Sequence, residues 1–192
     1  GGAGAAKMID EGLFADHQME TVWGMHNWPG LPAGEIAVSE GASMASADHF
    51  EMTVTGRGGH AAMPHQAIDP VLAAAHIVQA LQMLVSRHTN PQDSSVLSIT
   101  TIHGGSAFNV IPDEVILGGT VRAFRPETRA RLEQSLRDVS KLTAEAHGCT
   151  VAIDWRQGYP PTVNHQAEAI RAADVARAVV GADRVHMNPE PS

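Results

Sequence analysis

The hydrophobic pattern becomes regular at Phe50. Apolar residues alternate with polar ones from Phe50 to Thr55, which is the period of a strand with one buried face. Apolar residues then recur at helical spacing over Pro70–Arg87, with Asp69 placed to cap the helix and Pro70 at its first position. The pattern therefore predicts a strand followed by a capped helix.

A second half of similar pattern follows. We expect a β-bulge at Gly118-Gly119 and a buried helical stripe of Leu132, Leu136, Val139 and Leu142. The predicted elements are strands at Ser95–His103, Glu114–Phe124 and Thr150–Trp155 and a helix from Pro126 to Gly148. The order strand-helix-strand-strand-helix-strand over Phe50–Trp155 predicts an α+β fold of the ferredoxin-like βαββαβ type, an antiparallel sheet with two helices on one face.

The flanking segments are less regular. They predict helices at Ala3–Glu11 and Gln166–Val180 and short strands at Thr21–Met25 and Glu35–Val38. These flanks are too short to build a stable core alone. We therefore expect a complete domain, residues 48–161, inserted into a second domain of which residues 1–47 and 162–192 are segments.

Composition narrows the classes of partner. The net charge is -8, from 13 basic and 21 acidic residues, which argues against a nucleic-acid or anionic-membrane binder. Cys149 is the single cysteine, so no disulfide framework exists, as is usual in a reducing cytoplasm. The sequence has no apolar run of about 18 residues, so it predicts no membrane span.

The stretch Gly56–His65, G-R-G-G-H-A-A-M-P-H, is the strongest candidate for chemistry. Its glycines allow positive φ angles and close approach of a bound group. His60 at the end of the turn is a titratable donor and acceptor. A metal site shared with His65, hydrogen bonding to a developing oxyanion and plain turn chemistry are all compatible with this spacing.

Three further residues are candidates. His26, in M-H-N-W-P, is either a metal ligand at a strand end or a hydrogen-bonded loop histidine. Asn109 offers an amide to a carboxylate or carbonyl, or caps a turn. Arg122, in the strand G-T-V-R-A-F, suits a planar anion or a neighbouring acid.

Several stretches together resemble the metal-dependent amidohydrolases of the aminoacylase and carboxypeptidase family, in the branch of hippurate hydrolase, N-acyl-L-amino acid amidohydrolase and the indoleacetyl-amino acid hydrolases. They are G-G-A-G-A-A-K-M-I-D-E-G-L-F, G-M-H-N-W-P-G-L-P-A-G, G-R-G-G-H-A-A-M-P-H, G-G-S-A-F-N-V-I-P-D-E and G-T-V-R-A-F. The resemblance implies an α/β zinc-peptidase-like catalytic domain interrupted by a ferredoxin-like lid and dimerisation domain.

The resemblance also implies roles for the candidates. His26 would be one ligand of a two-metal site that holds zinc or manganese, or cobalt or nickel. His60 would reach the active site of the partner in a homodimer and stabilise the oxyanion. Asn109 and Arg122 would hold the substrate carboxylate or the closed lid. The reaction would be hydrolysis of the amide bond of an N-acyl amino acid.

The same resemblance implies that the chain is incomplete. The family's other metal ligands and its general-base glutamate would lie outside these 192 residues, and the chain starts without methionine. We therefore expect it to bind no two-metal centre and to be inactive alone. The alternatives are a non-catalytic ferredoxin-like dimerisation or ligand-binding module and a dipeptidase of the same superfamily.

Overall fold

The computed structural model describes residues 4–189, which divide into two compact units. Within this range the first unit comprises residues 4–41 and 163–189, and the second comprises residues 42–162. The chain passes from one unit to the other within β2 (Gly41–Met44) and returns within β9 (Thr162–Asn164). Each unit is described by itself below.

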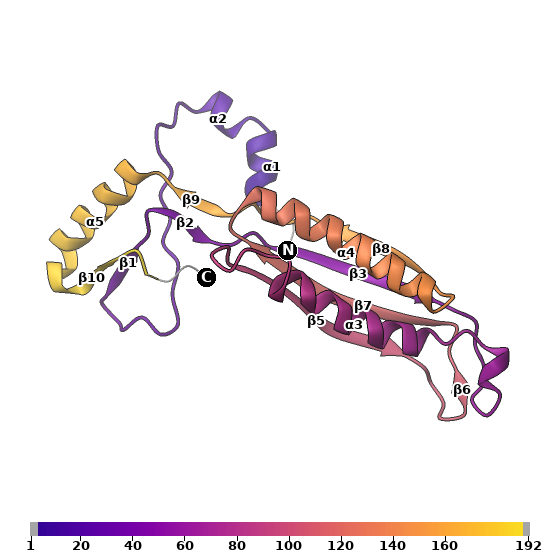
Figure 1. Cartoon of the computed structure of the whole chain (residues 1–192). Helices are drawn as coiled ribbons and strands as arrows, with labels where there is room; N and C mark the ends of the chain where they lie inside the picture. Colours follow the sequence, from indigo (N-terminus) through magenta and orange to yellow (C-terminus); the bar gives the residue numbers. More distant parts are fainter. Residues whose placement is uncertain (1–3, 190–192) are drawn as a thin grey trace. The chain divides into compact units, whose positions relative to one another are not determined.

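The second unit is built on a four-stranded sheet. Its strands are β3 (Asp48–Thr55), β5 (Ser95–Gly104), β7 (Glu114–Ala123) and β8 (Thr150–Arg156), in the order β5-β7-β3-β8. All three pairings are antiparallel. The helices α3 (Pro70–Ser86) and α4 (Pro126–Ala146) lie side by side on one face of the sheet (Figure 1). The unit therefore has an α+β fold.

The core lies between the sheet and the two helices. The alternation in β3 buries Phe50, Met52 and Val54, as the sequence pattern predicts. The two helices contribute further buried residues to this core, which are Ala73, Ala74, Ile77, Leu81, Leu84, Leu132, Leu136 and Ala144. The expected stripe on α4 is wrong at its end, because the side chain of Leu142 is 65% exposed.

The start of α3 is fixed by its predicted cap. The Asp69 carboxylate accepts hydrogen bonds from the backbone N–H groups of Val71 and Leu72, at 2.8 and 3.4 Å. Pro70 occupies the first turn, where no intrahelical bond needs its missing N–H group. The sequence prediction of this boundary is confirmed.

The expected bulge at Gly118-Gly119 lies on the other strand. Ile99 pairs with Gly119 and Thr101 pairs with Gly118, so Thr100 is the extra residue and belongs to β5. Gly118 and Gly119 are needed for close contact between the strands and not for the bulge. A Cβ at Gly119 would meet the Ser98 carbonyl oxygen at 2.2 Å, and one at Gly118 would meet Thr101 Oγ1 at 2.4 Å. Their missing side chains let these groups of the neighbouring strand β5 lie close to the β7 backbone.

The first unit is smaller. Strand β1 (Ile36–Val38) pairs in parallel with β10 (Val185–Met187), and α5 (Gln166–Val180) packs on both through Ala169, Ala173 and Ala176. The remaining elements of this unit are the helices α1 (Gly4–Asp10) and α2 (Leu13–Asp16) and the 3-10 turn η2 (Ala182–Arg184). The predicted helix starts at Ala3, which lies outside the described residues.

The predicted strand Thr21–Met25 is wrong. These residues have no regular secondary structure, and no described strand pairs with them. Val22 and Met25 are 71% and 94% exposed. An apolar run without a pairing partner gains neither ladder hydrogen bonds nor buried area, so hydrophobicity alone does not make it a strand.

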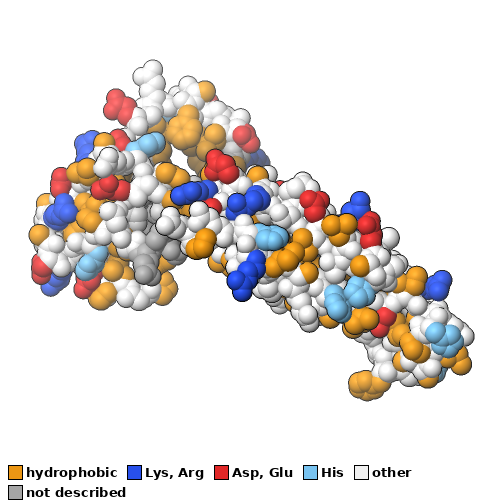
Figure 2. All heavy atoms as spheres, viewed as in Figure 1, with side chains coloured by type: hydrophobic (Ala, Val, Ile, Leu, Met, Phe, Trp, Pro, Cys, Tyr) orange, Lys and Arg blue, Asp and Glu red, His pale blue; other side chains and the backbone are white. Residues whose placement is uncertain are grey.

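The surface mixes charges of both signs. Figure 2 shows Lys and Arg side chains interspersed with Asp and Glu across the visible face, with hydrophobic side chains between them. Among the described residues, no helix has the length and apolarity that crossing a membrane requires.

A buried ion pair ties three segments together at one end of the four-stranded sheet. Asp48, the first residue of β3, has a fully buried side chain, and its two oxygens accept hydrogen bonds from Nε and Nη2 of Arg129 at 2.6 and 2.5 Å. The backbone N–H of Gly158 donates to the same carboxylate at 2.9 Å, and Arg129 Nη2 donates to the Gly158 carbonyl. The hydrogen bond to Asp48 raises the pKa of the Arg129 guanidinium above its ordinary value.

We predict that Asp48→Ala lowers the free energy of unfolding by about 3–5 kcal/mol, because it leaves the partly buried Arg129 charge without its partner. Chemical denaturation of the purified chain measures the loss. The matched control is Glu145→Ala, which removes an exposed ion pair to Lys141 of 3.9 Å and should cost less than about 1 kcal/mol. Equal losses in the two variants would contradict this role of Asp48.

Candidate functional site

His26 lies in an exposed loop of the first unit. Its Nδ1 is 2.6 Å from the carbonyl oxygen of Asn27, so Nδ1 carries the hydrogen and donates it. The ring of Trp28 approaches it edge-on, with the centroids 5.7 Å apart. The bond at Nδ1 leaves the lone pair of Nε2 free, which is how metal-binding histidines are commonly held. His26 therefore fits a single metal-ligand position.

A small ribbon holds His60 at the end of the second unit. Strand β4 (Gly59–His60) pairs with β6 (Val110–Ile111), and His60 stands opposite Val110. The backbone N–H of Ala62 donates to His60 Nδ1 at 3.1 Å. In the neutral ring the hydrogen is then on Nε2. His60 is exposed and so presents an N–H donor to the outside.

The glycines of this turn have a different role from the expected one. None of Gly56, Gly58 and Gly59 has a positive φ angle. A Cβ at Gly56 would lie 2.2 Å from the carbonyl oxygen of Ile68, and one at Gly58 would lie 2.6 Å from that of Ile111. The chain's own backbone, and not a bound group, therefore approaches these glycines closely. Because the glycines have no side chains, the segments on either side of His60 pack together.

Asp113 secures the turn and was not singled out from the sequence. Its carboxylate accepts a hydrogen bond from the Gly58 N–H at 2.8 Å, and its carbonyl accepts one from Gly56 at 2.9 Å. The signal was present, because Asp113 belongs to the stretch N-V-I-P-D-E that carries the family resemblance. Proline followed by aspartate is also a common turn pair.

The structure brings Asn109 to His60. The carbonyl oxygen of Asn109 accepts a hydrogen bond from the Ala61 N–H at 3.0 Å, directly beside the His60–Val110 pair. Asn109 is exposed, and the described residues offer no hydrogen bond to its side-chain amide. Asn109 and His60 therefore form one exposed polar cluster, and Phe108, which is fully exposed, lies next to it in the chain.

Arg122 lies at the other end of the sheet. It is eight residues along β7 from Glu114, the end at which the His60 turn is attached, and this corresponds to about 26 Å of extended strand. Its Nη1 atom is buried and has no hydrogen-bond partner among the described residues. The structure thus separates Arg122 from Asn109 within one chain.

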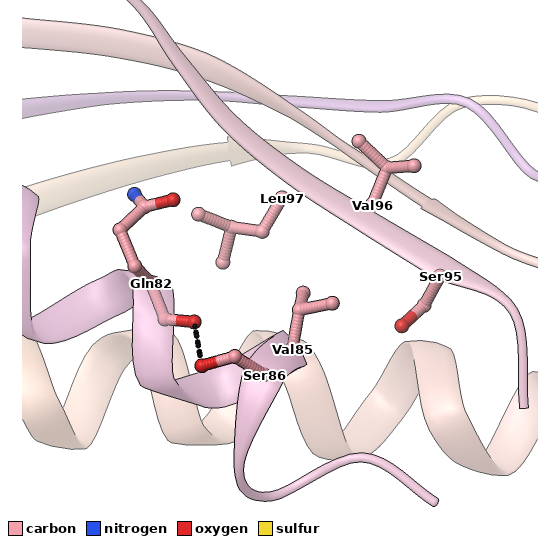
Figure 3. Close-up of a pocket in the computed structure, with 6 residues that line it drawn as sticks. All are labelled: Gln82, Val85, Ser86, Ser95, Val96 and Leu97. Carbon is pink, nitrogen blue, oxygen red and sulfur yellow. Dashed lines mark hydrogen bonds between the residues drawn. The ribbon is translucent and has the colours of Figure 1, made fainter. Parts of the chain in front are cut away.

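The described residues contain one surface pocket worth noting, between α3 and β5 (Figure 3). It has a volume of about 310 Å³ and is lined by Gln82, Val85, Ser86, Ser95, Val96 and Leu97. The Ser86 hydroxyl donates to the carbonyl of Gln82, while the buried Ser95 hydroxyl has no partner. The pocket has no acid, base or metal ligand, so its lining does not suit catalysis.

Two further observations limit the chemistry within residues 4–189. No group of three or more His, Cys, Asp or Glu side chains there is arranged to hold a metal ion. Burial raises the pKa of the Cys149 thiol, and the nearby Asp69 charge adds to the effect, so this cysteine is a poor nucleophile. Residues 4–189 therefore show no complete metal site.

The chain is similar to known proteins over most of its length. Residues 45–148 match a family model described as a peptidase dimerisation domain. The chain is 39% identical over 189 residues to N-acetylcysteine deacetylase from Bacillus subtilis, covering 98% of this chain and 49% of that protein. It is 37% identical over 188 residues to hippurate hydrolase from Campylobacter jejuni, covering 98% and 49%.

A solved structure shares the fold over almost the whole chain. It is a Bacillus subtilis protein described as a dinuclear metal binding peptidase of the M20 family, with a TM-score of 0.74 and 32% identity. The match covers 99% of this chain and 47% of that one. The chain thus spans about half the length of the curated relatives and of the solved structure that it matches.

We predict that Gly58→Ala disturbs the His60 turn, whereas Gly59→Ala does not. The new Cβ at residue 58 would overlap the Ile111 carbonyl, but at residue 59 it would meet only the Ala67 methyl group at 3.4 Å. Gly58→Ala should lower stability by about 1–3 kcal/mol and shift the imidazole NMR signals of His60. Unchanged His60 signals in Gly58→Ala would show that the turn does not need this glycine.

Proposed function

The chain belongs to the M20 amidohydrolase family, and from this membership we propose that the whole protein hydrolyses the amide bond of N-acyl amino acids. The names of two relatives, N-acetylcysteine deacetylase and hippurate hydrolase, support this substrate class. The observation that carries the proposal is the exposed pair of His60 and Asn109, held by backbone hydrogen bonds at the end of a rigid sheet.

His60 is the residue that stabilises the transition state in this proposal. Attack on an amide carbonyl places negative charge on its oxygen, and a preorganised N–H donor lowers the energy of that state. The bond from the Ala62 N–H to Nδ1 supports this role, because it leaves the hydrogen on the exposed Nε2. Asn109, beside it, presents its amide to the same substrate.

The domains have the following proposed roles. Residues 48–161 form a ferredoxin-like lid and dimerisation domain, and the segments 1–47 and 162–192 belong to an α/β catalytic domain. The strand order β5-β7-β3-β8 with both helices on one face supports the first assignment (Figure 1). The parallel pairing of β1 and β10 beside α5 supports the second.

The metal centre takes one ligand from this chain in our proposal. His26 Nε2 is free to bind, since Nδ1 donates to the Asn27 carbonyl. When bound, two divalent ions such as zinc or manganese would polarise the carbonyl and activate water. The hydrogen bond at Nδ1 orients the His26 ring and sets its tautomer.

Substrate binding is shared between two chains of a homodimer in this proposal. Strand β5 is an edge of the sheet and exposes Val96 and Ile102. Two β5 edges paired antiparallel across a twofold axis would bring the Gly104 end of one beside the Ser95 end of the other. Because Arg122 pairs with Val96 near that end, His60 and Asn109 of one chain would then approach Arg122 of its partner.

We predict that the 192-residue chain by itself does not hydrolyse N-acetyl or N-benzoyl amino acids when manganese or zinc is added. It supplies His26, but within residues 4–189 no group of three or more His, Cys, Asp or Glu side chains is arranged to hold a metal ion. Release of free amino acid measures the activity, and the whole protein is the positive control. Clear turnover by the 192-residue chain would contradict the prediction, and a preference of the whole protein for dipeptides would favour the dipeptidase alternative.

We predict that two inactive variants of the whole protein complement each other. His60→Ala should lower kcat about 10²–10³-fold by removing an oxyanion donor, and His26→Ala should remove activity by removing a metal ligand. In a mixed dimer, the His26→Ala chain donates His60 to the intact metal site of its partner. Random mixing should restore about a quarter of wild-type activity, since half the dimers are mixed and each has one working site.

The control variant is His88→Ala, which removes an exposed histidine outside the cluster. It should keep wild-type activity, and its equal mixture with His60→Ala should show about half of wild-type activity, the same as without exchange of chains. No recovery in the mixture of His60→Ala and His26→Ala would mean that His60 serves its own chain or that the protein is a monomer. Sedimentation of the wild type separates these two outcomes.

A further inference from the structure

Two imidazole rings meet between the helices of the second unit. His76 lies on α3 and His147 is the C-cap residue of α4. Their ring centroids are 4.6 Å apart, and the ring planes are inclined by 43°. The two helices run side by side (Figure 1) and are joined by the core residues between them, so the separation of the histidines is set by a packed interface.

Both rings have free nitrogens. In the described part of the chain neither imidazole makes a hydrogen bond or an ion pair with a protein group, whereas His26, His60 and His186 do. The side chain of His76 is exposed, and that of His147 is half-buried. Two neutral imidazoles at the surface therefore offer two lone pairs to the same region of solvent.

The local electrostatics favour a cation at this position. His147 ends α4, where the unpaired carbonyls carry partial negative charge. The last turn of α4 contains Glu145, whose carboxylate lies 3.9 Å from Lys141 Nζ, and no basic residue. A positive ion beside His147 would therefore be stabilised by the helix end.

We propose that His76 and His147 bind one divalent transition-metal ion of the class that prefers imidazole, such as zinc, nickel or copper. An ion held at about 2.0–2.1 Å from each nitrogen in tetrahedral geometry places the two nitrogens about 3.3 Å apart. Because the nitrogens lie on the rims of the rings, rings with centroids 4.6 Å apart reach this geometry by a small rotation. Water completes the coordination.

The site clamps α3 to α4. The helices carry the two ligands on rigid backbones, so little conformational entropy is lost when the ion binds. Protons compete with the ion for the same lone pairs, so the affinity depends on pH.

The test uses the 192-residue chain without a polyhistidine tag and with Cu²⁺ as the probe at half an equivalent. Electron paramagnetic resonance at pH 7.5 should report two imidazole nitrogens on the ion, and Zn²⁺ should displace it. His76→Gln and His147→Gln should each reduce the coordination to one imidazole and weaken binding at least tenfold by calorimetry. His88→Gln, an exposed histidine of the same unit, is the matched control and should bind as the wild type does.

Binding that is the same in the wild type and in His76→Gln would overturn the proposal, because the copper would then lie at other histidines. A single-imidazole signal in the wild type would do so as well. Glutamine is a good helix former and His76 is exposed, so His76→Gln keeps the fold and remains informative if His147→Gln does not.

Discussion

The buried Asp48 carboxylate is the constraint on which the second unit depends. It lies at the start of β3, the strand that pairs with both β7 and β8, and binds Arg129 of α4 and the backbone of Gly158. A buried charge that lost either partner would be costly, so the start of the central strand, the start of α4 and the segment after β8 are held together. From this fixed end β3 runs straight to the turn that bears His60.

The other end of the sheet, near His60, is held by close backbone contacts and hydrogen bonds instead of an ion pair. Gly56 and Gly58 let carbonyl oxygens of Ile68 and Ile111 approach where a Cβ would clash, and Asp113 bonds to both N–H groups. The His60 and Asn109 side chains remain exposed while their backbones are fixed. Such a cluster is suited to acting on a group that comes from outside the chain, which is what the proposed role in a partner's active site requires.

The sequence predicted the parts of the fold that depend on local pattern. Alternation marked β3, and Asp69 with Pro70 marked the start of α3. It failed where tertiary contacts decide. Thr21–Met25 finds no pairing strand among the described residues and Leu142 faces solvent. The bulge lies at Thr100 of β5 instead of at Gly118-Gly119. The pair of Asp48 and Arg129, 81 residues apart, leaves no periodic signal, and the roles of His26, Asn109 and Arg122 came from motif resemblance alone.

The length of the sheet keeps Asn109 and Arg122 of one chain apart. Asn109 and Arg122 are attached to opposite ends of β7, a separation of about 26 Å along the strand, far beyond the size of an acylated amino acid. A rigid antiparallel sheet cannot fold back to close this gap. If both side chains bind one substrate, they must come from two chains. A twofold axis perpendicular to the β5 edge is the simplest symmetry that sets the two β5 strands antiparallel and brings the opposite ends of the two chains together. The proposed homodimer thus follows from a shared substrate site as well as from the name of the matching family.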